Sequence, residues 1–296
     1  MRRPNKEIQL TSYDDLLGIN SETVIEKDTE QIKTVPLEEL YDFKDHPFRV
    51  VDDEKMEETT ASIAEYGVLV PGIARPRAEG GYELIAGHRR KHGSQRAGRK
   101  DMPVIIRNYS DDEATIIMVD TNIQREDILP SEKARAYRMK YEALKHQGIK
   151  GDGSTLEKVG EKAGDSAKTV QRYIQLSRLI DELLELVDSK KLGFVQGTEL
   201  ALLDEEQQRL VLTTITELNR SMTKTQAATI KEYGKKGELT RAVIEVILNQ
   251  NAPKERKVVL KPKMIKNYFS DDVSEEEIEN IIVQLLEEWK DRRGDE

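Results

Sequence analysis

The sequence contains no cysteine among its 296 residues. This absence excludes disulfide bonds, thiolate metal sites and cysteine nucleophiles, and it fits a location inside the cell. Aromatic residues make up only 5% of the chain, with a single Trp, which favours small aliphatic cores. No stretch approaches the roughly 20 apolar residues that a membrane helix needs, and Met1–Leu10 lacks the apolar segment of a signal peptide. We therefore expect a soluble, cytoplasmic protein that has no membrane partner.

Acidic residues exceed basic residues overall, giving a formal net charge of −9, but the charge is unevenly distributed. Residues 86–100 contain six Lys or Arg and no acidic residue, and residues 131–180 contain eleven basic against six acidic residues. Residues 270–296 contain three basic against eleven acidic residues. Charges interact over only about 8–10 Å in physiological salt. The middle of the chain can therefore attract DNA phosphates although the acidic tail repels them.

The length exceeds one typical domain, and the apolar pattern divides the chain into five parts. We expect a flexible arm over residues 1–34, a small α/β domain over 35–128 and a helical DNA-binding domain over 129–220. A helical extension over 221–252 and a strand-plus-helix module over 253–296 follow. The expected fold class is mainly α with a small α/β N-terminal domain.

Capping and turn residues predict where the elements begin and end. Helices are expected at Lys55–Tyr66, His88–Ala97 and 131–147, and strands at Ile73–Pro76, Tyr82–Ile85 and Met102–Arg107. Gly67 and Gly98 are expected to end the first two helices, and residues 79–81 to form the turn between the first two strands. Ser110 with Glu113, and Ser154 with Glu157, predict two capping boxes.

The most specific local pattern is LEKVGEKAGDSAKTVQRYIQL at residues 156–176, which is typical of a helix-turn-helix. Two crossing helices need a small residue where they touch, which Gly160 supplies. The turn needs a residue that tolerates positive φ, which Gly164 supplies. The side chains expected to fill the joint core are Val159, Ala163, Val170 and Tyr173.

The second helix of this motif is expected to present a polar face suited to DNA. Gln can read adenine edges and Arg guanine edges, while Ser and Lys near a helix start can hold phosphates. The expected DNA-binding residues are Ser166, Ala167, Lys168, Gln171, Arg172 and Gln175. The alternative is an ordinary helical hairpin with a solvated polar face, and the local excess of basic residues favours DNA.

Three stretches in the N-terminal part could form a second site: Gly67–Pro76, Gly87–Lys91 and Asn122–Asp127. A glycine that opens a helix and is followed by paired arginines can cradle a phosphate, because free N–H groups, the positive helix end and guanidinium groups converge. Asn122 and Asp127 carry oxygens that could hold a hard cation such as Mg²⁺. A glycine and two arginines alone usually form only a basic surface, so the prediction depends on all three stretches.

The order of these stretches, followed by the helix-turn-helix, resembles the ParB/Noc family of chromosome and plasmid partition proteins. The similarity covers about residues 35–210, and beyond residue 220 it is only general and closest to partition-like proteins of plasmids and mobile elements. The resemblance implies that the N-terminal domain binds CTP with Mg²⁺. It also implies that two copies close into a clamp around DNA that carries a palindromic site.

Carried over position by position, the resemblance implies a set of nucleotide-binding residues. They are Gly67, Gly87, His88, Arg89, Arg90, Asn122, Gln124 and Arg125. Asn122 would lie beside the metal, and Gln124 and Arg125 would support the closed clamp.

The chain departs from the family at three positions of this site. The family often has Glu where this chain has His88 and Thr121, and Gln where it has Val70. Carboxylates are the groups best able to hold Mg²⁺ or orient an attacking water. Nucleotide binding is therefore expected more than efficient hydrolysis, and His88 is expected at the surface or against a phosphate rather than as a base.

The last helix, expected from Ser274, carries an apolar stripe opposite a strongly acidic face. The stripe consists of Ile278, Ile281, Ile282, Leu285, Leu286 and Trp289. Such a stripe must be buried, either against a strand at Val258–Leu260 or against a second copy. A homodimer fits the two-fold symmetry of a palindromic DNA site.

The leading functional hypothesis is a sequence-specific DNA-binding partition protein that works with a ParA-type ATPase. Arg2 and Arg3 offer a basic segment of the kind that contacts such an ATPase in relatives. The first alternative is a ParB-domain transcriptional regulator or nucleoid-occlusion-like factor. The second is an enzyme that uses the N-terminal stretches as a nucleotide hydrolase.

Overall fold

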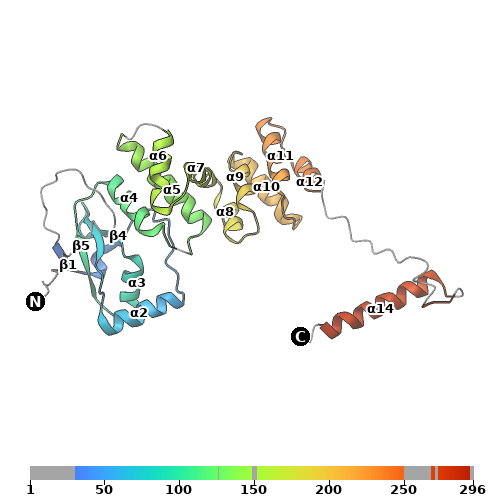
Figure 1. Ribbon diagram of the computed structural model, residues 1–296, viewed down its shortest axis with the longest axis horizontal. Coiled ribbons are helices and arrows are strands. Elements are labelled where there is room, and N and C mark those ends of the chain that lie inside the picture. Colours follow the sequence, from blue (N-terminus) through green and yellow to red (C-terminus); the bar gives the residue numbers. More distant parts are fainter. Residues whose placement is uncertain (1–30, 126, 149–151, 250–267, 271–272, 294–296) are drawn as a thin grey trace, which may run out of the picture. The chain divides into compact units, whose positions relative to one another are not determined.

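The computed structural model describes residues 31–125, 127–148, 152–249, 268–270 and 273–293 (Figure 1). The chain divides into two compact units, residues 1–248 and residues 249–296. None of the helices in the described ranges is both long and apolar enough to span a membrane.

A five-stranded mixed sheet forms the N-terminal part of the first unit. Its strands are β1 (Gln31–Pro36), β2 (Leu40–Asp42), β3 (Gly72–Pro76), β4 (Tyr82–Ala86) and β5 (Asp101–Ile106), in the order β1-β5-β3-β4-β2. The pairs β1–β5 and β3–β4 are antiparallel, and β3–β5 and β2–β4 are parallel. The three predicted strands are confirmed. Strand β1 begins at Gln31, so the sheet starts within the segment expected as a flexible arm.

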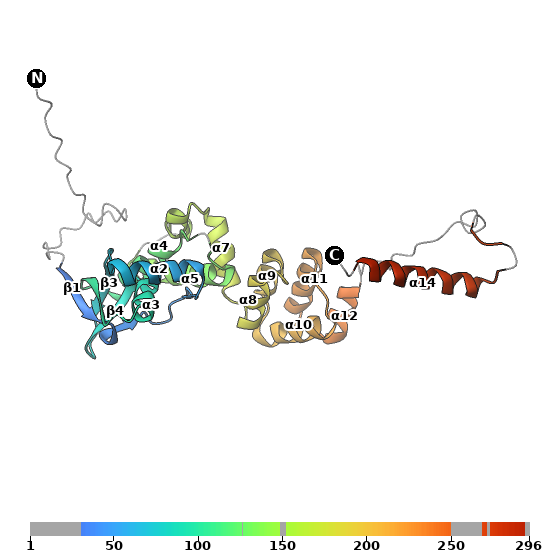
Figure 2. The ribbon, with the colours of Figure 1, turned by 90° about the horizontal axis from the view of Figure 1, so that it is seen from below.

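Helices α3 (His88–Arg96) and α4 (Asp111–Asn122) contact the sheet at β5 and β4, and α2 (Glu54–Tyr66) packs against α3. Figures 1 and 2 show α2 and α3 running next to each other and α4 lying between the sheet and α5 (Pro130–His146). Gly67 ends α2 at a φ of +75°, as predicted. The predicted capping box of α4 is also confirmed, because Ser110 and Glu113 exchange both hydrogen bonds.

The remainder of the first unit is helical. After α5 come α6 (Asp152–Gly160), α7 (Ala167–Leu176), α8 (Asp181–Asp188), α9 (Phe194–Leu200), α10 (Glu205–Glu217), α11 (Lys224–Lys235) and α12 (Arg241–Asn249). Helix α6 begins at Asp152, so Ser154 lies inside the helix and the capping box predicted for Ser154 and Glu157 is wrong.

Three hydrophobic cores stabilise this unit. Alternate residues of β3 and β4 point to opposite faces of the sheet, so Ala74 and Leu84 line one core while Ile73 and Ile85 line another. This second core continues through α4 and α5 to Val159 and Val170 of the helix-turn-helix. It therefore joins the sheet and the helix-turn-helix without an interruption.

The third core lies among α8 to α12 and includes Leu184, Leu200, Ile230 and Ile244. Helices α11 and α12 thus share a core with the helices before them. The residues expected as a separate helical extension pack as part of the preceding helical domain. Ala134 of α5 belongs to this third core as well.

The second unit contains α14 (Glu275–Arg293). Ser274 caps it as predicted: the Glu277 N–H donates to Ser274 Oγ at 3.3 Å, and the Ser274 N–H donates to the Glu277 carboxylate at 3.4 Å. Several large side chains of the apolar stripe are exposed, namely Ile281, Leu285, Leu286 and Trp289. The strand predicted at residues 258–260 lies outside the described residues, so homodimerisation through this stripe stays a prediction.

We expect Gly160→Ala to destabilise the helix-turn-helix strongly. A Cβ at Gly160 would lie 2.2 Å from the Asp165 carbonyl oxygen and 2.9 Å from Val170 Cγ2, and backbone atoms cannot move aside. The loss should be about 1–3 kcal/mol of unfolding free energy, measured by urea denaturation. The control is Gly193→Ala, whose added Cβ would meet only the flexible end of Gln196 and should cost under about 1 kcal/mol. An equal loss in both variants would contradict the close helix approach at Gly160.

Candidate functional site

The helix-turn-helix has the geometry that its glycines predict. Helix α6 is followed by a short 3-10 turn, η2 (Glu161–Ala163), and Gly164 then adopts a left-handed conformation with a φ of +70°. Ser166 caps α7, because its hydroxyl accepts a hydrogen bond from the Thr169 N–H at 3.2 Å. The start of the second helix near Ser166 is therefore confirmed.

One face of α7 is buried and the opposite face is exposed. Val170 and Leu176 are fully buried. Tyr173 is half-buried, with its ring 5.7 Å from the Tyr137 ring and 4.8 Å from the Phe194 ring between centroids. The exposed residues of α7 are Lys168, Gln171 and Arg172. The predicted outward face is thus accessible to a ligand.

A polar network fixes the orientation of α7 relative to α5. The Tyr137 hydroxyl donates to the Asp165 carboxylate at 2.5 Å, and Lys133 Nζ lies 2.6 Å from the same carboxylate oxygen. Burial of Tyr137 and its hydrogen bond to Asp165 raise the pKa of the Tyr137 hydroxyl, which stays protonated as a donor. Asp165 directly precedes the capping Ser166. The network therefore positions the first turn of α7.

The exposed cations of α7 differ in their ion pairs from Arg135 and Arg138 of α5. Lys168 and Arg172 form no ion pair with any residue that the structure describes. On α5, by contrast, Arg135 pairs with Asp181 at 2.7 Å and Arg138 with Glu142 at 3.0 Å. Unpaired cations on an exposed helix can bind DNA phosphates or base edges without first breaking a bond within the protein.

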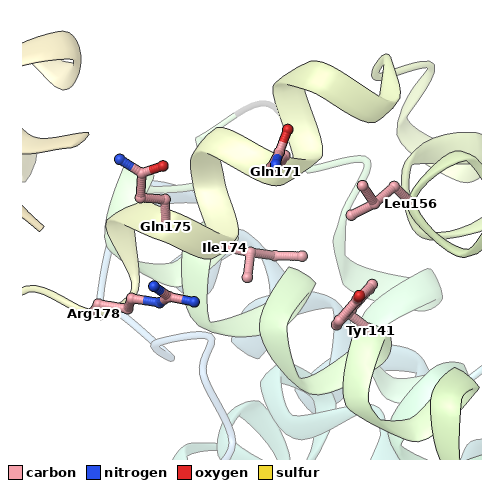
Figure 3. Close-up of a pocket in the computed structure, with 6 residues that line it drawn as sticks. All are labelled: Tyr141, Leu156, Gln171, Ile174, Gln175 and Arg178. Atoms are coloured by element: carbon pink, nitrogen blue, oxygen red, sulfur yellow. The ribbon is translucent and has the colours of Figure 1, made fainter. Parts of the chain in front are cut away.

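A pocket of about 320 Å³ opens beside this face (Figure 3). It is lined by Tyr141, Leu156, Gln171, Ile174, Gln175 and Arg178. Gln175 is only partly exposed, and its amide nitrogen donates to the Thr198 carbonyl oxygen at 2.5 Å. Its role in reading DNA stays a prediction, as do those of Ser166, whose hydroxyl caps α7, and Ala167.

Arg178 and Tyr141 are pocket residues that sequence reasoning missed. Arg178 is exposed and follows α7, whereas Tyr141 lies on α5, far from the motif in sequence. The excess of basic residues over 131–180 was the only signal that pointed to Arg178. Nothing in the sequence pattern places Tyr141 beside α7.

A second candidate site surrounds the first turn of α3. Gly87 precedes this helix in a left-handed conformation with a φ of +110°. A Cβ there would lie 3.2 Å from Gly72 Cα and 3.3 Å from Arg90 Nη2. Glycine is therefore required for both the conformation and the close approach of the chain, and the helix presents its free N–H groups at this point.

The two arginines after Gly87 are both engaged within the protein. Arg89 Nη2 donates to Asp53 Oδ1 at 2.9 Å. Arg90 Nη1 donates to the carbonyl oxygens of Val70 and Pro71 at 2.5 and 2.6 Å. The stretches Gly67–Pro76 and Gly87–Lys91 are thus brought together, as predicted.

The third stretch contacts other parts of the protein. The Asn122 amide nitrogen donates to the Met118 carbonyl oxygen of its own helix at 2.8 Å. Gln124 Nε2 donates to the Lys162 carbonyl oxygen in η2 at 2.7 Å. Asp127 pairs with Lys55 of α2 at 2.6 Å. This stretch therefore connects the N-terminal part to the helix-turn-helix through Gln124, whereas Asn122 makes no bond to the arginines.

The described side chains near Asn122 offer few ligands for a metal ion. Among the described residues, no group of three His, Asp or Glu side chains is placed to hold one. The Thr121 hydroxyl, at the position where the family often has Glu, donates to the Ile117 carbonyl oxygen at 2.9 Å. Asp127, the other residue expected to offer oxygens to the cation, pairs with Lys55. A Mg²⁺ ion at Asn122 would then depend mainly on ligand phosphates.

His88 packs against His46 and is partly exposed, lining a pocket of about 290 Å³ together with Asp42 and Lys91. The two rings are 4.0 Å apart between centroids, and Nε2 of each ring is buried without a hydrogen-bond partner. His46 Nδ1 donates to the Phe48 carbonyl oxygen at 2.8 Å. Burial, together with the neighbouring His46, lowers the pKa of His88 to about 3. The low pKa keeps His88 neutral at physiological pH, and its expected place at the surface or against a phosphate stays a prediction.

The His46–His88 pair predicts a pH dependence of stability. His88 is neutral in the folded chain, whereas its pKa in the unfolded chain is about 6.5. The contribution of neutral His88 to the free energy of unfolding is fully present above about pH 6.5 and is lost as the pH falls toward 3. Between pH 7 and pH 5 the free energy of unfolding of wild type, measured by urea denaturation, should fall by about 2 kcal/mol more than that of His88→Phe. The exposed His146 provides the control, His146→Gln, which should keep the wild-type dependence; an unchanged dependence in His88→Phe would contradict the buried pair.

Comparison with known proteins matches both sites to one family. The ParB N-terminal domain matches residues 21–123, and the ParB HTH domain matches residues 126–235. The chain is 30% identical over 211 residues to the chromosome-partitioning protein Spo0J of Thermus thermophilus, which covers 71% of this chain and 75% of that protein. It is 28% identical over 205 residues to a nucleoid occlusion protein of Listeria monocytogenes, with 69% of each chain covered.

Other similarities are shorter or weaker. A probable chromosome 1-partitioning protein ParB of Deinococcus radiodurans is 36% identical over 176 residues, but the match spans only 58% of that protein. Crystal structures of C-terminally truncated ParB from Caulobacter crescentus match with TM-scores of 0.41, for the complex with the centromeric parS site, and 0.30, for the complex with CTP-gamma-S. The parS complex is 23% identical and covers 74% of this chain and 99% of that chain. The CTP-gamma-S complex is 29% identical and covers 58% of this chain and 92% of that chain. From the sequence matches, the chain belongs to the ParB family of chromosome-partitioning proteins.

Proposed function

We propose that the chain is a sequence-specific DNA-binding partition protein that acts in chromosome or plasmid segregation, in the cytoplasm and associated with the nucleoid. The observation that carries this proposal is the exposed face of α7, which presents Lys168, Gln171 and Arg172; neither Lys168 nor Arg172 forms an ion pair with a described residue. The membership of the chain in a family of chromosome-partitioning proteins supports the role in segregation.

Recognition would place α7 in the major groove of DNA. Lys168, in the first turn, is suited to a phosphate, and Gln171 and Arg172 are suited to base edges. The anchoring of Asp165 by Tyr137 and Lys133 supports this function, because base readout needs a helix with a fixed orientation. Phosphate contacts position the protein, whereas contacts to base edges give it sequence preference.

The first turn of α3 would bind the phosphates of CTP. Free N–H groups after Gly87 and the guanidinium groups of Arg89 and Arg90 form a suitable phosphate cradle. The cytidine base is assigned from family membership, as is Mg²⁺, and Gly67 and Asn122 are the other residues assigned by position. The hydrogen bond from Gln124 to the Lys162 carbonyl supports communication between this site and the helix-turn-helix.

Hydrolysis is not part of this proposal. The neutral His88 faces His46, and the Thr121 hydroxyl is bonded to its own helix. Neither residue supplies a carboxylate beside Asn122 that could orient an attacking water. The interpretation of the chain as primarily a nucleotide hydrolase is therefore the weaker one, and nucleotide binding would serve to control DNA binding.

Two protein partners complete the proposal. A second copy would bind through the apolar stripe of α14, whose exposed members include Leu285 and Trp289, because a palindromic site suits a two-fold dimer. A ParA-type ATPase would contact Arg2 and Arg3, which lie outside the described residues. Arg125 would support the closed form of the dimer, as the resemblance implies.

A nucleoid-occlusion-like factor is the second candidate function. The similarity to nucleoid occlusion proteins supports it, since those matches cover about the same share of this chain as the partition-protein match. The two functions would use the same face of α7. They differ in where the bound sites lie on the replicon and in whether a ParA-type ATPase is a partner.

The DNA-reading role of α7 predicts a loss of specificity in Arg172→Ala. Affinity for a site selected from random duplexes should fall by about 1–3 kcal/mol, with little change for a scrambled duplex, as measured by fluorescence anisotropy at fixed salt. Arg209→Ala is the matched control, because Arg209 is exposed on α10 but paired with Glu205 at 2.7 Å. Unchanged binding of Arg172→Ala to the selected site would show that α7 is not the recognition helix.

The proposed cradle predicts that Arg89→Ala combined with Arg90→Ala abolishes CTP binding. Both phosphate-binding guanidinium groups are removed, whereas α7 is untouched, so affinity for the selected DNA site should remain. Isothermal titration calorimetry and anisotropy would measure the two affinities. The control is Arg96→Ala on the same helix, because Arg96 pairs with Asp52 at 2.6 Å. CTP affinity equal to wild type in the double variant would rule out the cradle.

A further inference from the structure

The Asp53 carboxylate is shared between two tasks. Oδ1 accepts the Met56 N–H at 2.8 Å and thereby caps α2. The same oxygen accepts a hydrogen bond from Arg89 Nη2 at 2.9 Å. The Arg89 hydrogen bond is the main cause that lowers the pKa of Asp53, so the carboxylate stays charged at neutral pH. A permanent negative charge therefore lies against one arginine of the proposed cradle.

The two arginines of the cradle are held in different ways. Arg90 donates to the carbonyl oxygens of Val70 and Pro71, which orient its guanidinium group. Arg89 is held by an anion, and a carboxylate binds a guanidinium group in the same manner as a phosphate does. A phosphate that contacts Arg89 through the same N–H must displace Asp53. Arg89 is therefore subject to competition between an internal and an external anion.

The exposure of the pair is compatible with exchange. The Asp53 side chain is 42% exposed and that of Arg89 is 25% exposed, so neither charge is locked in a dry interior. Exposed ion pairs are weak and reversible. When Arg89 leaves, Asp53 can still accept the Met56 N–H, so the start of α2 keeps its cap.

We propose that Asp53 is an internal competitor for the nucleotide phosphates: it holds Arg89 in the phosphate-free state and releases it when a triphosphate binds at the start of α3. This inference rests on the nucleotide site proposed above. Asp53 thereby lowers nucleotide affinity and makes the movement of Arg89 part of the binding step. The exchange also frees the Asp53 carboxylate from Arg89. Asp53 lies two residues before Lys55, which pairs with Asp127 of the third stretch.

The test replaces Asp53 by residues that cap a helix but carry no charge. Asn and Ser are both good N-cap residues, so Asp53→Asn and Asp53→Ser should keep α2 folded, which thermal unfolding would verify. Removing an exposed ion pair that competes with the ligand should lower the Kd for CTP about two- to fivefold. Calorimetry on the full chain, with CTP and with inorganic triphosphate, would measure this change for the whole nucleotide and for its phosphates alone.

The neighbouring aspartate provides the matched control. Asp52 bonds to His92 and Arg96 on the same helix α3, away from the cradle arginines. Asp52→Asn should therefore leave the Kd for CTP within about twofold of wild type. In an Arg89→Ala background, Asp53→Asn should give no gain, because there is no Arg89 to release.

Each outcome decides between the hypotheses. Tighter binding by Asp53→Asn and Asp53→Ser, lost in the Arg89→Ala background, supports the competition. Equal or weaker binding by both variants, with a wild type that binds CTP, overturns it, because Asp53 would then have no effect on Arg89 or would position it for the phosphate. Absence of binding to wild type and all aspartate variants overturns the nucleotide site itself, and the inference with it.

Discussion

Helix α5 is the element on which the arrangement of both candidate sites depends. Tyr137 and Leu144 of this helix belong to the core that joins the sheet to α7, and Ala134 belongs to the core of α8 to α12. Lys140 is almost completely buried and pairs with Asp120 of α4 at 2.5 Å. A buried charge without its partner is costly, so this pair holds α4 and α5 in one relative position. The stretch that follows α4, proposed as part of the nucleotide site, and α7, the proposed recognition helix, are therefore positioned by the same helix.

The basic side chains of the two candidate sites differ in their ion pairs. On α7, Lys168 and Arg172 are exposed and free of ion pairs with the described residues, so the DNA surface is available at once. At α3, Arg89 is already bound to Asp53. A ligand there must rearrange the site before it can bind. This difference suits a protein that finds DNA rapidly by electrostatic attraction and uses a nucleotide as a slower, controlling ligand.

Local chemistry made much of the fold predictable from the sequence. Gly160 and Gly164 were assigned from the steric needs of two touching helices, and the structure gives them those roles. Long-range contacts were not predictable. The packing of His88 against His46 cannot be predicted, because His46 lies 42 positions earlier, in a segment without a recognisable pattern. The pairing of Arg89 with Asp53 cannot be predicted, for the same reason. An apolar pattern also does not show which helices share a core, so it does not reveal that α11 and α12 pack with α8 to α10.

The most direct test of the central claim is genome-wide crosslinking of the full chain to DNA, with and without added CTP. The account predicts enrichment at a small number of discrete sites, because α7 reads sequence. It also predicts that CTP extends the enrichment into flanking DNA well beyond the length that one bound dimer covers. Uniform, sequence-independent enrichment would contradict α7 as a recognition helix, and discrete sites with the same width in both conditions would contradict the control of DNA binding by a nucleotide.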